Sequence, residues 1–187
     1  MPYEERKLAG RQGTRGNYYE KALLEAGRFR EQYEERKGVI RSDEMPWEEC
    51  SQGHIKHIAN ENMETAECAL NIYLQTLFPG GSSGKHRHMA EEIFFVLEGA
   101  GYDLHWDVDF DILDEYSWSW AEEPKRYEWE EGDFVYIPPY TMHQHFNADS
   151  NRPARFLTAT NRMLKCLGLD WLEQLAAAPG NRAMNSG

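Results

Sequence analysis

Two histidines separated by one residue, with a glutamate four positions later, are the first side chains in this sequence that could do chemistry. They are His86, His88 and Glu92. On a β-strand, side chains two positions apart point to the same face, so we expect the two imidazoles to lie together. Imidazole nitrogens and a carboxylate oxygen are ligands for divalent iron, manganese, zinc, nickel or copper. This segment therefore predicts part of a metal site.

A second group follows the turn residues Gly132 and Asp133. His143, His145 and Asn147 alternate along the chain, so a regular strand presents all three on one face. Neighbouring strands of a barrel bring together residues that the sequence separates, which allows His143 to complete the ligand set. A histidine is also a common hydrogen-bonded structural residue, and the residue types alone leave that alternative open.

Both groups resemble the two sequence motifs of the cupin superfamily. The first motif has the pattern G-x5-H-x-H-x3-E-x6-G, and its fixed positions are occupied here by Gly80, His86, His88, Glu92 and Gly99. The second motif has the pattern G-x5-P-x-G-x2-H-x3-N. Its fixed positions are occupied by Gly132, Pro138, His143 and Asn147, with Tyr140 where the family usually has glycine.

This resemblance implies a fold, a ligand set and a class of reaction. The fold would be an all-β, jelly-roll-like cupin barrel, with one metal ion bound by His86, His88, Glu92 and His143. The sequence around both motifs is similar to that of the gentisate 1,2-dioxygenase-like branch of cupins. This chain has a single barrel. Members of that branch open aromatic rings with Fe(II) and O₂. We therefore expect Fe(II), with manganese, zinc, nickel and copper as alternatives.

The elements that must position these residues are mostly short runs of strand-forming residues separated by glycines and polar residues. We expect an N-terminal arm and helix within 1–50, with the helix at 17–37, the barrel at 51–160, and a C-terminal helix and tail at 161–187, with the helix at 161–177. The expected strands are 39–40, 55–58, 68–78, 92–97, 102–106, 134–137, 143–146 and 155–160. The acidic, tryptophan-rich segment 103–126 predicts either a hairpin over the barrel mouth or a subunit contact.

Several other side chains are candidates for the site. His145 and Tyr136 are candidate catalytic residues, His145 as an acid or base beside the metal. Gln75, Tyr140 and Arg162 are candidate substrate-binding residues, and Arg162 could bind a carboxylate. For each of these five residues, the sequence leaves open an ordinary structural or surface role.

Composition excludes several classes of partner. The chain of 187 residues has a formal net charge of −12 and no basic face, which argues against a nucleic-acid partner. No apolar run approaches the length of a membrane span, and the N-terminus lacks the pattern of a signal peptide. Three widely spaced cysteines indicate reduced thiols and a cytoplasmic protein. The aromatic-rich segments and the family habit lead us to expect a homodimer.

Three functions are compatible with this sequence. The first is a metal-dependent dioxygenase that cleaves a small, oxygenated, aromatic substrate with O₂. The second is another cupin metalloenzyme, namely an isomerase, lyase or decarboxylase. The third is a non-catalytic accessory protein that binds a metal or ligand.

Overall fold

The computed structural model describes residues 16–65, 69–112 and 116–180. The chain divides into two compact units, Met1–Arg36 and Lys37–Gly187. In the first unit, helix α2 (Tyr18–Glu35) agrees closely with the helix predicted at 17–37. The predicted N-terminal arm falls almost wholly outside the described residues. Among the described helices, none has the length and apolar character needed to cross a bilayer.

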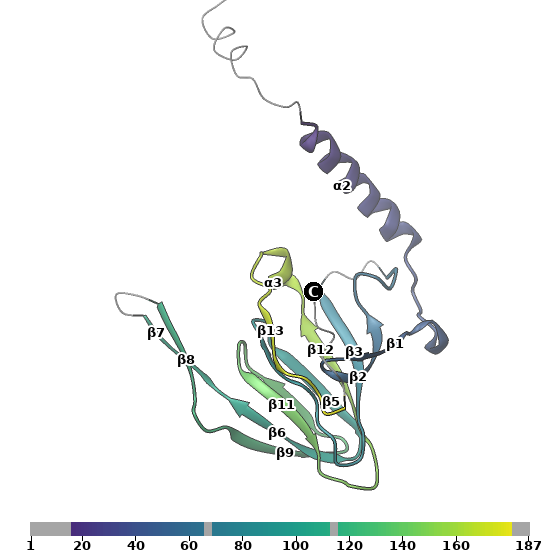
Figure 1. The fold of residues 1–187 in the computed structure, drawn as a ribbon. Coiled ribbons are helices and arrows are strands. Elements are labelled where there is room, and N and C mark those ends of the chain that lie inside the picture. The colour runs from purple at the N-terminus through teal and green to yellow at the C-terminus, as the bar shows by residue number, and fades with distance from the viewer. Residues whose placement is uncertain (1–15, 66–68, 113–115, 181–187) are drawn as a thin grey trace, which may run out of the picture. The chain divides into compact units, whose positions relative to one another are not determined.

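The second unit contains two antiparallel sheets and a separate hairpin (Figure 1). The first sheet has the strand order β1 (Trp47–Cys50), β2 (Gly53–Ala59), β3 (Leu70–Leu77), β12 (Ala154–Asn161), β5 (Glu92–Glu98) and β10 (Phe134–Ile137). The second has the order β13 (Leu172–Ala176), β4 (Lys85–His88), β11 (Met142–Asn147), β6 (Ala100–Trp106) and β9 (Lys125–Glu130). A short helix, η1 (Ser42–Glu44), precedes β1, and residues 39–40 are not in a strand. The structure confirms the all-β prediction.

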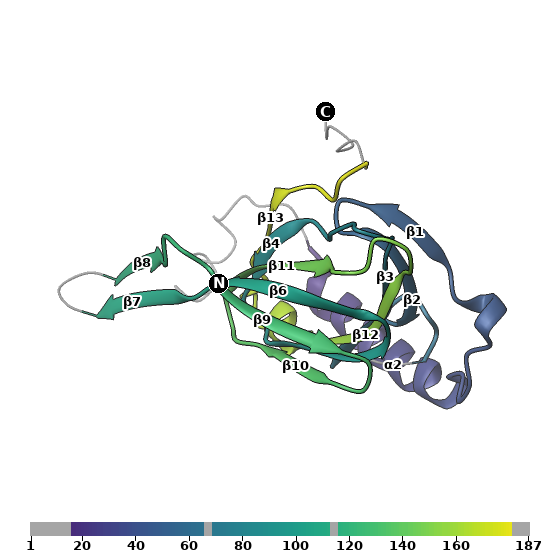
Figure 2. The ribbon, with the colours of Figure 1, turned by 90° about the horizontal axis from the view of Figure 1, so that it is seen from below.

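The two sheets curve toward each other and enclose a common interior (Figure 2). Alternation along β5 shows how the sequence builds this interior. Glu92, Phe94 and Val96 are fully buried, whereas Phe95 and Leu97 are exposed on the outer face. On β11, His143, His145 and Asn147 are buried on one face, as their spacing predicts.

One part of the interior is an apolar core to which both sheets contribute. Its buried members are Leu77, Phe94, Val96, Trp129, Ile137, Ala154 and Phe156. The ring of Phe94 lies 4.5 Å from that of Phe156 and 5.9 Å from that of Trp129, centroid to centroid. Because Trp129 comes from the second sheet and the other two rings from the first, this core joins the two sheets.

The C-terminal segment corrects the helix predicted at 161–177. Only α3 (Met163–Cys166) is helical, and Leu172–Ala176 forms β13 instead. Gly168, with φ of +73°, ends the helical turn in a conformation that glycine adopts easily. Strand β13 then pairs with β4, opposite His86 and His88. The open hydrogen-bonding edge of β4 outweighs the local helical pattern.

The segment 103–126 contains the end of β6, the start of β9 and a hairpin of β7 (Val108–Ile112) and β8 (Tyr116–Trp120). The hairpin extends away from the two sheets (Figures 1 and 2). At its base the indole of Trp120 donates a hydrogen bond to the carbonyl of Tyr140, at 3.2 Å. The segment thus contains a hairpin, one of the two predicted forms, and none of its described residues lines the cavity described below.

Candidate metal centre

Four side chains converge in the interior between the two sheets. His86 and His88 come from β4, Glu92 from the start of β5, and His143 from β11. One ligand atom from each lies within 4.8 Å of the other three, so the group could hold a single metal ion. Strand register explains the convergence, because His143 is paired directly with His86 across β11 and β4.

The backbone fixes the orientation of all three imidazoles. Nδ1 lies 3.2 Å from the Gly84 carbonyl oxygen in His86, 2.7 Å from that of Ala90 in His88, and 2.9 Å from that of Thr141 in His143. A proton on each Nδ1 donates to that carbonyl, which leaves the Nε2 lone pairs of His86 and His143 free, whereas Nε2 of His88 faces Glu92. This is the arrangement by which metal-binding histidines are usually oriented.

The absence of a side chain at Gly84 allows β4 to lie where it does. A Cβ at this position would collide with the carbonyl oxygen of Ser51 and with the backbone of Ala176. Gly84 is thus packed between the turn after β1 and the end of β13. Its carbonyl is also the one that orients His86, so this glycine contributes to the geometry of the site.

Burial keeps two of the imidazoles neutral. Burial lowers the pKa of His86 to about 3, although the charge of Glu92 opposes this shift. Burial also holds the pKa of His143 well below its usual range, and the neighbouring His86 lowers it further. A neutral imidazole has a lone pair to give to a metal, so these two side chains are ready to bind one at neutral pH.

Glu92 is a buried carboxylate held in its charged form. Burial alone would raise its pKa, but the nearby imidazole of His145 and the hydrogen bond from His88 outweigh this and hold the pKa well below its usual range. Its Oε2 lies 3.1 Å from Nε2 of His88 and accepts a weak hydrogen bond, at 3.5 Å, from the hydroxyl of Tyr73. Burial lowers the pKa of His88, but its contact with Glu92 raises it by more.

The residues fit a divalent metal ion. Nε2 of His143 and Oε1 of Glu92 are buried without a hydrogen-bond partner in the described part of the chain. Leaving such atoms unsatisfied costs about 1–3 kcal/mol each, and a metal ion would remove that cost. Three nitrogens and one carboxylate oxygen suit iron, manganese, zinc, nickel or copper.

A second polar group lies behind Glu92. Nδ1 of His145 donates a hydrogen bond to Oδ1 of Asp103 at 3.0 Å, and the indole of Trp129 donates to the same oxygen at 2.8 Å. Nε2 of His145 is 3.6 Å from Oε1 of Glu92. Burial alone would lower the pKa of His145, but the charge of Asp103 raises it to about 10. A protonated His145 therefore lies between two carboxylates.

The metal cluster opens onto a cavity of about 370 Å³. His86, His88 and Glu92 line one part of it. Other lining residues include Ile55, His57, Asn60, Glu61, Asn71, Tyr73, Thr160, Arg162, Lys165, Asp170 and Leu172. A volume of this size accommodates a small organic molecule next to the metal.

The additional site residues predicted from the sequence lie in different places. Arg162 lines the cavity, whereas Gln75 is fully buried and donates to the backbone carbonyl of Gln52 without lining the cavity. Tyr136 is 52% exposed, because β10 turns Ile137, not Tyr136, toward the interior. This position corrects the catalytic role predicted for Tyr136, since its ring lies on the outer face.

Tyr140 also lies away from the cavity. Its φ of +61° places it in the left-handed conformation, which explains why the family usually has glycine here. Its ring packs against Trp118, Trp120 and Trp171, and its backbone N–H donates to the carbonyl of His88. This packing corrects the predicted substrate contact and gives Tyr140 a structural role that holds the turn before β11.

Two residues at the site were not predicted from the sequence, namely Tyr73 and Asp103. Tyr73 precedes Gln75 by two positions on β3, so the same alternation that pointed to Gln75 also places Tyr73 inside. Asp103 precedes His105 by two on β6, and both are buried. Strand parity was thus a usable signal for both, but it does not tell which inward residue reaches the metal cluster.

Known proteins resemble this chain in sequence and in fold. A 5-aminosalicylate 1,2-dioxygenase from Comamonas sp. is 27% identical over 119 residues, which cover 63% of this chain and 26% of that protein. A structure of oxalate decarboxylase superposes with a TM-score of 0.55 at 17% identity, over 73% of this chain and 31% of that one. A single-residue variant of the Bacillus subtilis oxalate decarboxylase superposes with a TM-score of 0.54 at 18% identity, over 72% of this chain and 31% of that one. The structural matches show the fold.

The chain spans only about a quarter to a third of the length of these relatives. The profile of the auxin binding protein family, in contrast, matches residues 36–172, which include every described strand except β13, of which only Leu172 falls within the match. The gentisate-like branch named from the motifs stays a prediction. The motif residues, the two facing sheets and the family profile agree, and the chain belongs to the auxin binding protein family, within the cupin superfamily.

Proposed function

We propose that this protein is a metal-dependent dioxygenase, with Fe(II) as its metal, that acts on a small, oxygenated aromatic molecule. The observation that carries the proposal is the cluster of three imidazoles and one carboxylate beside a cavity of about 370 Å³. The likeness to a 5-aminosalicylate 1,2-dioxygenase supports oxygen chemistry on an aromatic ring. The resemblance of the motif sequences to the gentisate-like branch supports the same chemistry.

His86, His88, Glu92 and His143 would hold the ion. A bound Fe(II) ion would supply redox chemistry and coordination positions for small molecules beyond those occupied by protein. The chain supplies neutral imidazoles at His86 and His143, and a charged carboxylate at Glu92. One anionic ligand leaves the site with a net positive charge, which favours an anionic oxygen donor on the substrate.

His145 and Tyr73 act on Glu92 in this proposal. His145, fixed by Asp103, presents Nε2 toward one oxygen of Glu92, and the Tyr73 hydroxyl approaches the other. His145 does not line the cavity, so we assign it the positioning of the carboxylate ligand and not direct proton transfer to the substrate. Tyr73 does line the cavity and is placed to contact both Glu92 and a bound molecule.

We also propose that the enzyme is a homodimer in the cytoplasm. Support for a dimer comes from the outer face of the first sheet, where Phe95, Leu97, Phe134 and Tyr136 are all exposed. Contiguous apolar side chains of this kind mark contact surfaces. Sedimentation of the wild-type protein and of Phe134→Lys measures the oligomeric state; a wild-type monomer contradicts this part of the proposal.

The test is oxygen consumption by protein reconstituted with Fe(II) in the absence of air. Mixing with aerated buffer and a panel of gentisates, catechols, hydroxyquinols and 5-aminosalicylate should give substrate-dependent oxygen uptake for at least one compound. His86→Ala should abolish that uptake. His54→Ala is the matched control, because His54 lies on β2 beside Glu49 and Trp47, away from the metal cluster. Silence across the panel with iron bound contradicts the dioxygenase and favours a different reaction at the same site.

A further inference from the structure

Arg87 lies between two of the predicted metal ligands but points the other way. On β4 the side chains of His86 and His88 face the interior, so the alternation of the strand places Arg87 on the outer face of the second sheet. Its side chain is nonetheless only 16% exposed. Because a charged side chain on the outer face of a sheet is usually solvated, this degree of burial calls for an explanation.

Three elements enclose the guanidinium of Arg87. Its Nε donates a hydrogen bond to Oε2 of Glu173 on β13 at 2.7 Å, and Nη2 contacts the same oxygen. Cζ lies 3.7 Å from the ring centroid of Trp120, at the base of the β7–β8 hairpin, and 5.4 Å from that of Tyr140. Charge-assisted pairing and stacking on aromatic rings combine here in a way that arginine permits and lysine does not. The side chain of Arg87 therefore ties β4 to β13 and to the hairpin.

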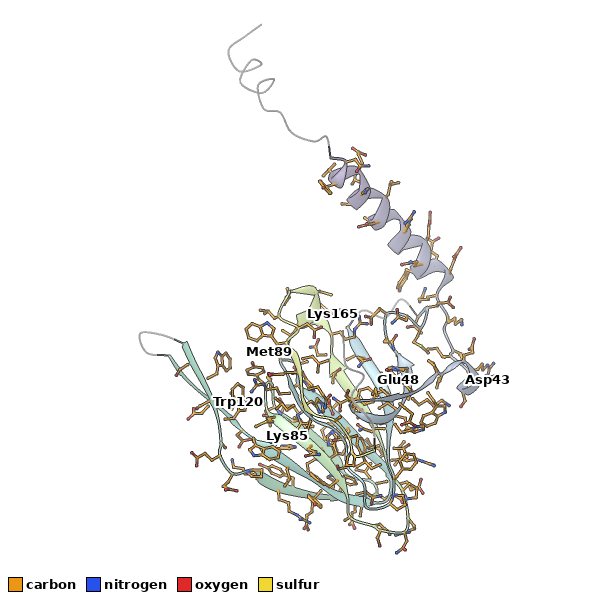
Figure 3. The ribbon with its side chains drawn as sticks, in the orientation of Figure 1. Asp43, Glu48, Lys85, Met89, Trp120 and Lys165 are labelled. Atoms are coloured by element: carbon orange, nitrogen blue, oxygen red, sulfur yellow. The ribbon has the colours of Figure 1, made fainter. Side chains whose placement is uncertain are left out.

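A second set of contacts joins these elements to the backbone of β4. The indole of Trp120 donates to the carbonyl of Tyr140 at 3.2 Å, and the backbone N–H of Tyr140 donates to the carbonyl of His88 at 2.8 Å. Next to His88, the N–H of Met89 donates to the carbonyl of Trp171 at 3.1 Å. Figure 3 labels Trp120 at the base of the hairpin and Met89 just after β4. The end of β4 that carries a predicted ligand is thus held by the same elements that enclose the guanidinium.

Strand β4 depends on β13 for most of its backbone pairing. Its register with β11 is a single residue pair, His86 with His143, whereas its register with β13 covers the whole of Lys85–His88. The contact between Arg87 and Glu173 belongs to that ladder, since these two residues are directly paired. Ligands of a metal site must be held within about 0.5 Å of their productive positions. A side chain that fastens β4 to its neighbours therefore also fixes the separation of the two imidazoles on β4.

We propose that Arg87 is a positioning residue, which holds His86 and His88 at the spacing that a metal ion needs and couples the β7–β8 hairpin to the metal centre. Occupancy of the metal centre and packing of Trp120 against Arg87 then stabilise each other, because a coupling between two sites acts equally in both directions. The proposal concerns metal binding, so it goes beyond the proposed function and does not depend on which reaction follows.

Metal affinity of the full chain tests the positioning role. Arg87→Met keeps the aliphatic part of the side chain and removes the guanidinium. It should weaken Fe(II) binding by about 10- to 100-fold, as expected for a residue that orients metal ligands from behind. Arg87→Lys keeps the charge but not the planar group, so it should recover part of that loss. Equilibrium dialysis in the absence of air measures both ratios.

Arg126→Met is the matched control. Arg126 lies on β9 of the same sheet, where Cζ is 3.6 Å from the ring centroid of Tyr102 and Nη2 is 3.3 Å from Oε1 of Glu128. The contact types are those of Arg87, but β9 carries no predicted ligand. Urea unfolding of the metal-free proteins records what each variant costs in stability, whereas only Arg87→Met should lose metal affinity. A role of Arg87 in stability alone would leave both affinities unchanged.

Hydrogen exchange tests the coupling. Saturating Fe(II) should slow the exchange of backbone amides in the hairpin strands, Val108–Ile112 and Tyr116–Trp120, by about fivefold or more in the wild-type protein, as is typical of coupled sites. In Arg87→Met the same amides should exchange equally fast with and without saturating Fe(II). Trp120→Leu, which keeps Arg87 and Glu173 but removes the ring, should also weaken Fe(II) binding. This variant keeps the proposal testable if Arg87→Met does not fold.

The outcomes separate this inference from the proposed function. Wild-type Fe(II) affinity in Arg87→Met or in Trp120→Leu, or an equal loss of affinity in Arg126→Met, overturns the positioning role. Metal-dependent protection of the hairpin that persists in Arg87→Met overturns the coupling. Absence of oxygen uptake by the wild-type protein contradicts the dioxygenase but leaves all of these predictions in place, because they are measured without oxygen.

Discussion

The interior between the two sheets has an apolar region and a polar region, which differ in how far their buried atoms are satisfied by neighbouring groups. In the apolar region, Phe94, Trp129 and Phe156 pack ring against ring. In the polar region, four potential ligands meet, and two of their buried atoms lack hydrogen-bond partners among the described residues. The first region gains free energy from packing, whereas the second retains unsatisfied groups that a ligand can use.

The same strands build both regions. β5 contributes Glu92 to the polar region and then, two and four positions later, Phe94 and Val96 to the apolar one. His145 lies at the boundary: its ring contacts Phe94 and Phe156 on one side and approaches Glu92 on the other. Stability and metal chemistry are thus separated along single strands, and substitutions in the two regions should have different consequences.

The largest effect is expected from Phe94→Ala in the apolar region. Phe94 is fully buried between the two sheets, so its truncation should lower the free energy of unfolding by about 3–5 kcal/mol. Urea unfolding followed by tryptophan fluorescence measures this loss. The control is Phe78→Ala on the surface, where the ring is 57% exposed, and it should cost much less. Equal losses for the two variants would contradict the division between interior and surface.

Asp103→Asn should be the next most harmful change, because it breaks a buried charge pair at the boundary. Asp103 holds His145 and accepts from Trp129, so its neutralisation should cost about 3 kcal/mol in the metal-free protein. Asp107→Asn, which affects an exposed pair with Lys125, is the matched control and should be nearly neutral. A neutral Asp103→Asn would show that His145 is uncharged in the folded protein.

The same pair predicts how the stability of the metal-free protein depends on pH. The pKa of His145 is about 10 in the folded protein, above its unfolded value of about 6.5. The contribution of protonated His145 to the free energy of unfolding is therefore fully present below pH 6.5 and is lost as the pH rises toward 10. The lowered pKa values of His86 and His143 act in the other direction and reduce stability below pH 6.5.

Unfolding measured at several pH values should show maximum stability near neutral pH. The decline on the alkaline side should be smaller in Asp103→Asn, since the charge of Asp103 is the main factor that raises the pKa of His145. A stability that increases steadily from pH 6.5 to 10 in the wild-type protein would contradict this assignment.

Metal binding should stabilise the protein only through the ligands of the polar region. At a free Fe(II) concentration 100 times the dissociation constant, the wild-type protein should gain about 2.7 kcal/mol of unfolding free energy. His143→Ala, which removes one ligand, should gain almost nothing at the same concentration. Phe95→Ala should show the full gain. Thermal unfolding with and without Fe(II), in the absence of air, measures all three, and an equal gain in His143→Ala would place the ion elsewhere.

Tyr73→Phe should have the smallest effect. The hydroxyl of Tyr73 makes only a 3.5 Å contact with Glu92, so its loss should change stability by less than about 1 kcal/mol. Metal affinity should fall by about tenfold, the lower end of what is typical for residues that orient a metal ligand, because the contact is long. Equilibrium dialysis with Fe(II) measures this ratio. A loss as large as that of His143→Ala would make Tyr73 a direct ligand and not a positioning residue.

Strand alternation explains which parts of the fold and site were predictable from the sequence. A period of two places His86 with His88, and His143 with His145, on common faces without knowledge of tertiary structure. The carboxylate of Glu92 was a candidate from its type and position, and the cupin resemblance joined it with the three histidines in one ligand set. The all-β architecture followed from the same short runs of strand-forming residues.

The rest depended on contacts between distant segments. Tyr136 was a candidate catalytic residue, but the pairing of Ile137 with Glu92 sets the parity of β10 and turns Tyr136 outward. Residues 172–176 form a strand only because the edge of β4 is available to them. The pairing of Arg162 with Glu61 likewise joins segments that local sequence patterns do not connect.

The most direct test of the metal centre is the metal-edge X-ray absorption spectrum of protein loaded with one equivalent of Fe(II). Our account predicts one ion per chain with a first shell that contains three imidazole nitrogens, and no bound ion when His86 and His143 are both replaced by alanine. Stoichiometric binding that survives this double replacement, or a spectrum without imidazole scattering, would contradict it.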